Sequence, residues 1–196
     1  MNVQSECDAL FVDINETLYC SLGSNHQVVK RSLSDAKMTS VILVAGTGFE
    51  GSEFNELNQP HGIFVDVNFD LYVADYANNR IQLWPLGESS GITVAGKESA
   101  NPTINLLQPT AVVLDAEKYL FIVDNGNNRI VGSGSNGFRC LVGCSEPNLS
   151  TDAENIPYGF NFDRCGNMFV SVYHVNNRTQ RIQKFRHLDK SCGKLE

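Results

Sequence analysis

An apolar segment that ends in aspartate recurs four times along the chain at almost constant spacing. It reads DALFVD, HGIFVD, TAVVLD and YGFNFD, and it ends at Asp13, Asp66, Asp115 and Asp163. Successive aspartates lie 53, 49 and 48 residues apart. A second apolar run starts five residues after each aspartate, and an asparagine follows after twelve or thirteen. These registers, kept over four copies, predict a repeat protein with a unit of about 49 residues.

Each repeat holds short runs rich in Val, Ile, Phe and Tyr, bounded by Gly, Asn, Asp or Pro, which is typical of β-strands. A third run follows the asparagine, and a fourth ends at Gly46, Gly96 or Gly143 in the first three copies. The four-residue links between first and second runs suit tight antiparallel hairpins. Four antiparallel strands per unit predict an all-β fold made of β-propeller blades. We place the blades at about residues 7–46, 60–96, 109–143 and 157–186 of a single domain spanning residues 1–196.

The second repeat resembles the NHL-repeat family of propellers. It reads QPHGIFVD at residues 59–66, LYVAD at 71–75 and NNRIQ at 78–82, and the third repeat keeps most of this pattern. In the outer copies Leu22 and Val172 replace the second aspartate, and the fourth carries Thr179-Gln180-Arg181 as an insertion. The resemblance covers residues 7–186, and propellers of this family usually close with six blades.

Four repeats therefore predict an incomplete, open part of a six-bladed ring, and a closed four-bladed propeller is the alternative. No apolar run after Phe185 supplies an outer strand for the fourth blade. An open array leaves apolar faces on its first and last blades, and such faces favour self-association.

Charged and amide residues at fixed places in the repeats are expected to shape turns. A carboxylate at the end of a first strand accepts backbone N–H bonds from the hairpin that follows. Aspartates before the Asn-Asn-Arg turns can pair with the arginine, and Asn78, Asn79, Asn127 and Asn128 tolerate left-handed backbone. We assign structural turn roles to Asp66, Asp75, Asn78, Arg80, Asp115, Asp124, Asn127 and Arg129.

The six cysteines leave the cellular compartment undecided. They are too sparse for a disulfide-built scaffold and form no zinc-type cluster. Cys20 aligns with core positions, so we interpret it as a small core residue. Cys140 and Cys144 can pair only if the chain turns at Gly143. Three N-x-S/T sequons, at Asn15, Asn148 and Asn177, are about as many as composition predicts by chance.

The composition argues against several classes of function. Lys and Arg total 15 against 22 Asp and Glu, and the net charge of −7 disfavours binding to a phosphate backbone. No apolar run has the length of a membrane helix, and the first residues do not resemble a signal peptide. The glycines form neither a GxGxxG nor a phosphate-binding loop, and no GxSxG sequence is present.

Loops from every blade are expected to converge where the first strand enters the blade and the second leaves it. The residues at these positions that we predict to meet a partner are His61, Tyr76, Thr110, Asn125, Tyr158 and His174. Aromatic rings mixed with hydrogen-bonding groups suit a protein or peptide surface. The leading interpretation is a non-catalytic scaffold without a cofactor or metal. Resemblance to NHL proteins of the tripartite-motif type implies the recognition part of a ubiquitin-ligase-type assembly.

The alternative interpretation is a metal-dependent lyase or hydrolase. His26, His61 and His174 come from three blades and are predicted to open on the same face. This arrangement resembles the metal-bearing peptidyl-amidating lyases, which are propellers of the same kind. The three histidines are not at equivalent positions of their repeats, so we assign neither a metal site nor a catalytic residue.

Overall fold

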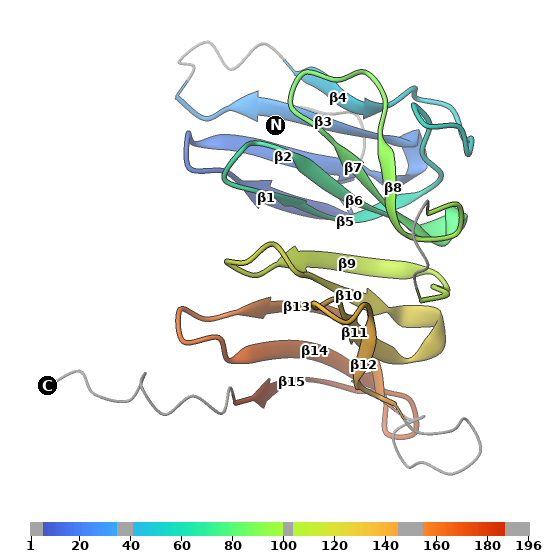
Figure 1. Ribbon diagram of the computed structural model, residues 1–196, viewed down its shortest axis with the longest axis vertical. Coiled ribbons are helices and arrows are strands. Elements are labelled where there is room, and N and C mark those ends of the chain that lie inside the picture. Colours follow the sequence, from blue (N-terminus) through green and yellow to red (C-terminus); the bar gives the residue numbers. More distant parts are fainter. Residues whose placement is uncertain (1–5, 35–40, 100–103, 145–154, 187–196) are drawn as a thin grey trace, which may run out of the picture.

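The computed structural model describes residues 6–34, 41–99, 104–144 and 155–186. They form four antiparallel sheets that follow one another from the top to the bottom of Figure 1. This is the propeller-blade arrangement that the repeat predicts. Within these residues no helix is both long enough and apolar enough to span a membrane.

The first two blades have four strands each, in sequential order. Blade 1 consists of β1 (Ala9–Val12), β2 (Thr17–Leu22), β3 (Gln27–Ser32) and β4 (Ile42–Gly46). Blade 2 consists of β5 (Pro60–Val65), β6 (Leu71–Asp75), β7 (Arg80–Trp84) and β8 (Ile92–Gly96). Matching registers put Leu10 opposite Cys20 in blade 1 and Ile63 opposite Val73 in blade 2. These residues therefore occupy equivalent places in their blades.

The third blade is complete, and the fourth has three strands among the described residues. Blade 3 consists of β9 (Pro109–Leu114), β10 (Leu120–Asp124), β11 (Arg129–Gly132) and β12 (Arg139–Val142). Blade 4 consists of β13 (Asn155–Phe162), β14 (Met168–His174) and β15 (Thr179–Phe185). The predicted insertion is part of β15, because Thr179, Gln180 and Arg181 pair with the last three residues of β14. It lengthens the hairpin and forms no bulge.

The same aspartate turn closes the first hairpin of every blade. Oδ1 of Asp13 accepts the backbone N–H groups of Asn15 and Thr17, each at 2.9 Å. The equivalent carboxylates of Asp66, Asp115 and Asp163 accept the N–H groups two and four residues later at 2.8 to 3.0 Å. The third residue after each aspartate has positive φ: Glu16, Phe69, Lys118 and Gly166. The carboxylate thus replaces the backbone acceptors that a four-residue turn lacks.

A short 3₁₀ turn joins the second and third strands of the first three blades: η1 (Gly23–Asn25), η2 (Tyr76–Asn78) and η3 (Asn125–Asn127). Each turn ends in a left-handed residue, namely His26, Asn79 and Asn128, with φ of 52°, 57° and 51°. The prediction of left-handed backbone was therefore right for Asn79 and Asn128 and wrong for Asn78 and Asn127. The latter two lie inside the 3₁₀ turn, where their side chains hydrogen-bond instead.

The glycines that end the outer strands are required by close packing. Gly46 and Gly96 have φ of +80° and +87°, and an added Cβ would overlap the carbonyl oxygens of His26 and Asn79. Gly143, directly after β12, is in the same situation beside Asn128. A residue with a side chain would be strained in this backbone region and would displace the neighbouring strand.

The hydrophobic core lies between the blades, where the sheets pack face to face. Tyr19 and Trp84 belong to the cluster between blades 1 and 2, Ile81 and Val112 to the next, and Val123 and Val170 to the last. Blade 1 keeps a further buried cluster of Cys20, Leu22 and Val29, whereas the outer face of blade 4 is exposed by comparison. Ile182 is 73% exposed, whereas Ile81, at the same register position of blade 2, is completely buried. Exposed apolar end faces were predicted, and self-association through them stays a prediction.

A disulfide corrects the interpretation of Cys20, and a second disulfide meets the condition stated for Cys140 and Cys144. Cys20 is completely buried, yet it is bonded to Cys7, with 5.5 Å between the Cα atoms. It is therefore more than a small core residue. Cys140 and Cys144 also form a disulfide, with Cα atoms 5.6 Å apart. The chain makes the required turn at Gly143, where φ is +70°.

Candidate binding face

Four side chains share one position of the repeat at one end of the blades, directly before β1 or near the start of the other first strands: Asp8, His61, Thr110 and Tyr158. Beside them lie the residues that follow the second strands. The rings of His61 and Tyr76 stack, with centroids 4.4 Å apart and planes at 22°. The structure therefore brings together two of the residues predicted to meet a partner.

Two more of the predicted residues join blade 3 to blade 4. Thr110 Oγ1 donates to the carbonyl oxygen of Tyr158 at 2.9 Å. Asn125 Nδ2 donates to the carbonyl oxygen of Pro157 at 2.7 Å. Tyr158 itself is 53% exposed. His174 lies at the end of β14 in register with Asn155, so it belongs to the same blade end.

Burial changes the protonation of His61. Desolvation lowers the pKa of its imidazole below the ordinary value, and the nearby negative charge of Asp8 opposes the change. The Asp8 carboxylate is fixed by the N–H of Gly23, 2.7 Å from Oδ2. His61 is therefore a neutral aromatic surface at pH 7, able to donate one hydrogen bond and accept another.

A buried ion pair in blade 2 holds the loop behind this face. Asp75 Oδ2 accepts from Arg80 Nε at 2.7 Å and from Asn78 Nδ2 at 2.9 Å, and Oδ1 accepts the N–H of Asn58 at 2.7 Å. Asp75 and Arg80 are 0% and 1% exposed. Arg80 also donates to the carbonyl oxygens of Ser52, Glu53 and Glu56. The pair thereby ties the connection between blades 1 and 2 to the second blade.

Blade 3 repeats this network with a more open arginine. Asp124 accepts from Arg129 Nε at 2.7 Å, from Asn127 Nδ2 at 2.8 Å and from the N–H of Leu107 at 2.7 Å. The side chain of Arg129 is 23% exposed. In blade 2, desolvation raises the pKa of Asp75, while its hydrogen bonds and Arg80 act in the opposite direction. In both blades the carboxylate is a structural hub that points away from solvent.

His26 has a structural contact that its sequence position did not suggest. Its Nδ1 accepts the N–H of Gln59 at 3.2 Å, and in the next blade Asn79 Oδ1 accepts the N–H of Gln108 at 2.8 Å. His26 therefore links blade 1 to blade 2 as Asn79 links blade 2 to blade 3. In the parts of the chain that the structure describes, no three His, Cys, Asp or Glu side chains are grouped to hold a metal ion.

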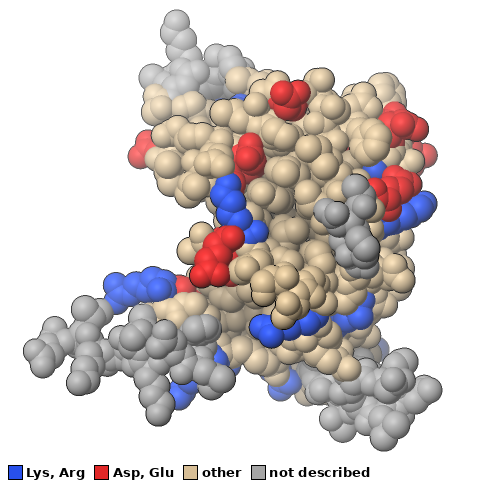
Figure 2. Space-filling model, viewed as in Figure 1, with Lys and Arg blue, Asp and Glu red and all other residues tan. Residues whose placement is uncertain are grey.

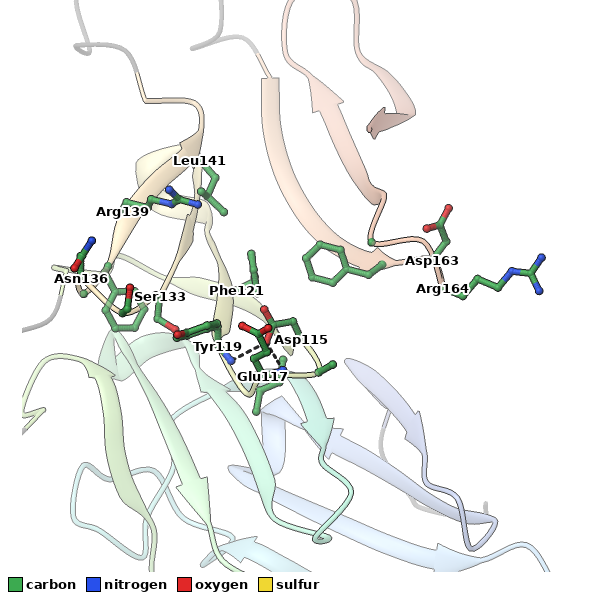
Figure 3. A pocket seen from close by; sticks show the side chains of 18 residues that line it. Asp115, Glu117, Tyr119, Phe121, Ser133, Asn136, Arg139, Leu141, Asp163 and Arg164 are labelled. Carbon is green, nitrogen blue, oxygen red and sulfur yellow. Dashed lines mark hydrogen bonds between the residues drawn. The ribbon is translucent and has the colours of Figure 1, made fainter. Parts of the chain in front are cut away.

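A cavity of about 940 Å³ lies near the hairpin ends of blades 3 and 4. Figure 3 shows Asp115, Glu117 and Tyr119 on the β9–β10 hairpin and Asp163 on the β13–β14 hairpin. Its aromatic wall includes Phe121 and Phe162, whose centroids are 4.9 Å apart. Sequence reasoning missed this cavity.

The lining of the cavity differs from the corresponding part of blade 2. Ser133 follows β11 at the place where blade 2 has Trp84, which is 2% exposed. Ser133 Oγ accepts the N–H of Leu120 at 2.7 Å, so the side chain is turned to the backbone. Gly132, Ser133, Gly134, Ser135, Asn136 and Gly137 are all small here. The loss of a bulky residue within this run was the available sequence signal.

The two halves of the array carry opposite charge. Residues 6–34 and 41–99 contain twelve acidic and four basic side chains, whereas residues 104–144 and 155–186 contain four acidic and eight basic ones. Figure 2 shows Asp and Glu mainly over the upper blades and Lys and Arg mainly over the lower ones. The net charge of the whole chain hides this asymmetry.

The sequence comparison identifies the repeat directly. Residues 57–83, which run from the loop before β5 to the end of β7, match the NHL repeat family. Blade 2 is an NHL repeat. The match ends before β8, the outer strand of the blade. A search of curated proteins gives no match for the chain.

Several solved propeller structures are similar to this chain over part of their own length. Streptogramin B lyase is 15% identical, with a TM-score of 0.55 over 92% of this chain and 54% of its own. A virginiamycin B lyase from Staphylococcus aureus is 14% identical, with a TM-score of 0.56 over 92% of this chain and 55% of its own. A protein described as a gluconolactonase is 11% identical, with a TM-score of 0.61 over 93% of this chain and 64% of its own. The chain thus spans between 54% and 64% of these structures, and the likeness shows the propeller fold alone.

Proposed function

We propose that this chain is a non-catalytic binding module, and that the face formed by the starts of the first strands and the ends of the second strands binds a protein or peptide. One observation carries the proposal. The buried Asp-Arg network behind the face repeats between blades 2 and 3. By contrast, one position on the face differs in every blade: it holds Asp8, His61, Thr110 and Tyr158 in turn. In a repeat scaffold, recognition is placed on the positions that vary over a fixed framework.

The chemistry of the face supports a polypeptide ligand. The stacked His61 and Tyr76 and the exposed ring of Tyr158 offer large contact area, and aromatic residues are enriched in protein interfaces. The opposite charges of the two halves suit a partner with both acidic and basic segments. A nucleic acid would meet the acidic half unfavourably.

Structures similar to this chain include lyases and a protein described as a gluconolactonase, so an enzyme is the competing function. Its sequence basis is the set of His26, His61 and His174. Since His26 Nδ1 already accepts the N–H of Gln59, only its Nε2 is available to a metal. Recognition within a ubiquitin-ligase-type assembly would be one use of the binding face.

The binding face is tested with a displayed random-peptide library. Tyr76→Ala, Tyr158→Ala and His174→Ala are combined in one variant. The matched control combines Asn68→Ala, Glu117→Ala and Arg164→Ala, three exposed residues at the opposite hairpin ends. The expected result is that peptides selected on the unaltered chain lose at least tenfold in affinity for the first variant and keep their affinity for the control.

Two results would overturn the proposal. Equal loss in both variants, or loss only in the control, would move binding away from this face. Stoichiometric zinc or calcium in the purified chain that is removed by His61→Ala and by His174→Ala would support the enzyme instead. Thermal melting of both variants separates loss of binding from loss of the fold.

A further inference from the structure

The described cysteines are all oxidised. Cys7 pairs with Cys20, and Cys140 pairs with Cys144. Cys165 is disulfide-bonded as well. Structural disulfides persist in the secretory pathway and outside cells, and they are rare in the reducing cytosol. The disulfides therefore favour the secretory pathway or the outside of the cell over the cytosol, which the cysteine count left undecided.

The first sequon lies at an exposed hairpin tip. Asn15 is solvent-exposed in the turn between β1 and β2. Its backbone N–H and that of Thr17 are bound to Asp13 Oδ1. The turn is thus held by the Asp13 carboxylate, and these hydrogen bonds do not use the Asn15 side-chain amide. Ile14, beside it, is 78% exposed.

The sequon at Asn177 is exposed at the turn from β14 to β15. Asn177 and Thr179 are both exposed, and Thr179 Oγ1 donates to Asn177 Oδ1 at 2.6 Å. The hydroxyl and the amide of the sequon thus lie on the same side of one turn. This hydrogen bond engages the acceptor oxygen of the amide and not its Nδ2 donor.

The repeat supplies internal controls for both sites. Asn68 occupies the place of Asn15 in blade 2, but Asp70 stands where Thr17 completes the sequon. Asn79 and Asn128 lie in the corresponding turns of blades 2 and 3, and each is followed by Arg and Ile. Asparagines thus recur in the inner blades, exposed at Asn68 and half-buried at Asn79 and Asn128, whereas hydroxyl residues complete the sequon only in the two end blades. The sequon at Asn148 lies outside the described residues.

We propose that Asn15 and Asn177 carry N-linked glycans, added as the chain passes through the secretory pathway. The donor is an oligosaccharide on a lipid diphosphate. The bond between the sugar C1 and the diphosphate oxygen breaks, and a C1–N bond forms to Asn Nδ2, which loses a proton. The lipid diphosphate is the leaving group, so no oxidant or reductant is needed. This goes beyond the proposed function, because it holds whether or not the binding face has a ligand.

The glycans would lie on the blades with exposed apolar side chains. Val12 and Ile14 of the first blade are 51% and 78% exposed, and Ile182 of the fourth is 73% exposed. Glycans are bulky and strongly hydrated, and the terminal units of a repeat array need a polar outer surface. The sugars at Asn15 and Asn177 therefore keep the end blades soluble.

The test is a peptide map of the full chain. The chain is produced in a eukaryotic cell behind a cleavable secretion signal, and whole-cell and secreted protein are treated with peptide N-glycosidase in heavy-oxygen water. The expected result is conversion of Asn15 and Asn177 to labelled aspartate, and none at Asn68, Asn79 or Asn128. The same map is made of the protein isolated from its source.

Matched hydroxyl variants make the test specific. Thr179→Val should abolish modification of Asn177, whereas Thr179→Ser should retain it; Thr17→Val and Thr17→Ser form the same pair for Asn15. Each variant at one sequon should leave the other site modified, which controls for folding. Unmodified Asn15 and Asn177 in protein whose two disulfides are formed would overturn the proposal, as would free thiols at Cys7 and Cys20 in the protein from its source.

Discussion

Lys118 Nζ donates to Asp66 Oδ2 at 2.8 Å, although 52 residues separate the two. Lys118 is the left-handed residue of the β9–β10 hairpin, and Asp66 directly follows the first strand of blade 2. The same carboxylate accepts the N–H groups of Asn68 and Asp70 through Oδ1. One aspartate therefore holds its own hairpin and the hairpin of the next blade.

This contact predicts a loss of stability at acid pH. Burial disfavours the charge of Asp66, but the hydrogen bonds from Lys118, Asp70 and Asn68 together hold its pKa below the ordinary value. Its contribution to the free energy of unfolding is therefore complete above the unfolded pKa of about 4 and is lost as the pH falls through the lower folded pKa. Melting temperatures measured between about pH 6 and pH 2 should show this fall.

A lysine variant isolates the contact between the hairpins. Lys118→Met should make the acid-dependent fall shallower, because the pKa of Asp66 moves back toward its ordinary value. Lys97→Met is the matched control, since Lys97 is 71% exposed and lies 3.9 Å from Glu98. Identical pH profiles for both variants would contradict the assignment.

The buried ion pair of blade 2 should matter more to stability than its counterpart in blade 3. Asp75→Ala leaves Arg80 buried without its carboxylate, which costs about 3 kcal/mol or more. Asp124→Ala should cost less, because Arg129 is 23% exposed and water can reach it. Urea unfolding of both variants provides the comparison. A loss for Asp124→Ala equal to or larger than that for Asp75→Ala would show that burial does not set the cost.

How much the sequence predicted depends on what the repeat encodes. Strand positions, hairpin aspartates and outer-strand glycines recur in every complete unit, so their roles follow from comparing one blade with the next. Cys7 lies outside the repeated strands and pairs with a position that holds an apolar residue elsewhere. Its partner therefore aligned as a core residue, and only the fold brings the two sulfurs together.

The candidate site was predictable in part for the same reason. The stack of His61 and Tyr76 follows from the pairing of strand ends, which the repeat fixes. The contacts of Thr110 and Asn125 run to the backbone of blade 4, and carbonyl groups carry no sequence signal. His26 was compared with other histidines, although its structural counterpart is Asn79.

The two mapped disulfides should contribute unequally to the free energy of unfolding. Cys7–Cys20 spans 13 residues and Cys140–Cys144 spans four. Because a longer closed loop restricts the unfolded chain more, Cys7→Ala with Cys20→Ala should cost about 3 kcal/mol, and Cys140→Ala with Cys144→Ala about 2 kcal/mol. Equilibrium unfolding of the two double variants without reductant measures the difference. A larger loss for the shorter loop would indicate that local packing at β12 dominates over chain entropy.

His61 should titrate below the ordinary histidine pKa of about 6.5. Burial lowers its pKa, and the negative charge of Asp8 opposes this effect. Asp8→Asn should therefore lower the midpoint further, while the amide oxygen can still accept the N–H of Gly23. Because the unfolded imidazole binds its proton more tightly than the folded one, His61 should reduce stability as the pH falls below about 6.5.

Imidazole resonances followed by NMR from about pH 8 to pH 4, with His61→Gln to assign the signal, give the midpoint of the His61 titration. Tyr76→Ala should raise it, because loss of the stacked ring at 4.4 Å exposes the imidazole to water; a midpoint above 6.5 in the unaltered chain would mean that Asp8, and not burial, controls this part of the binding face.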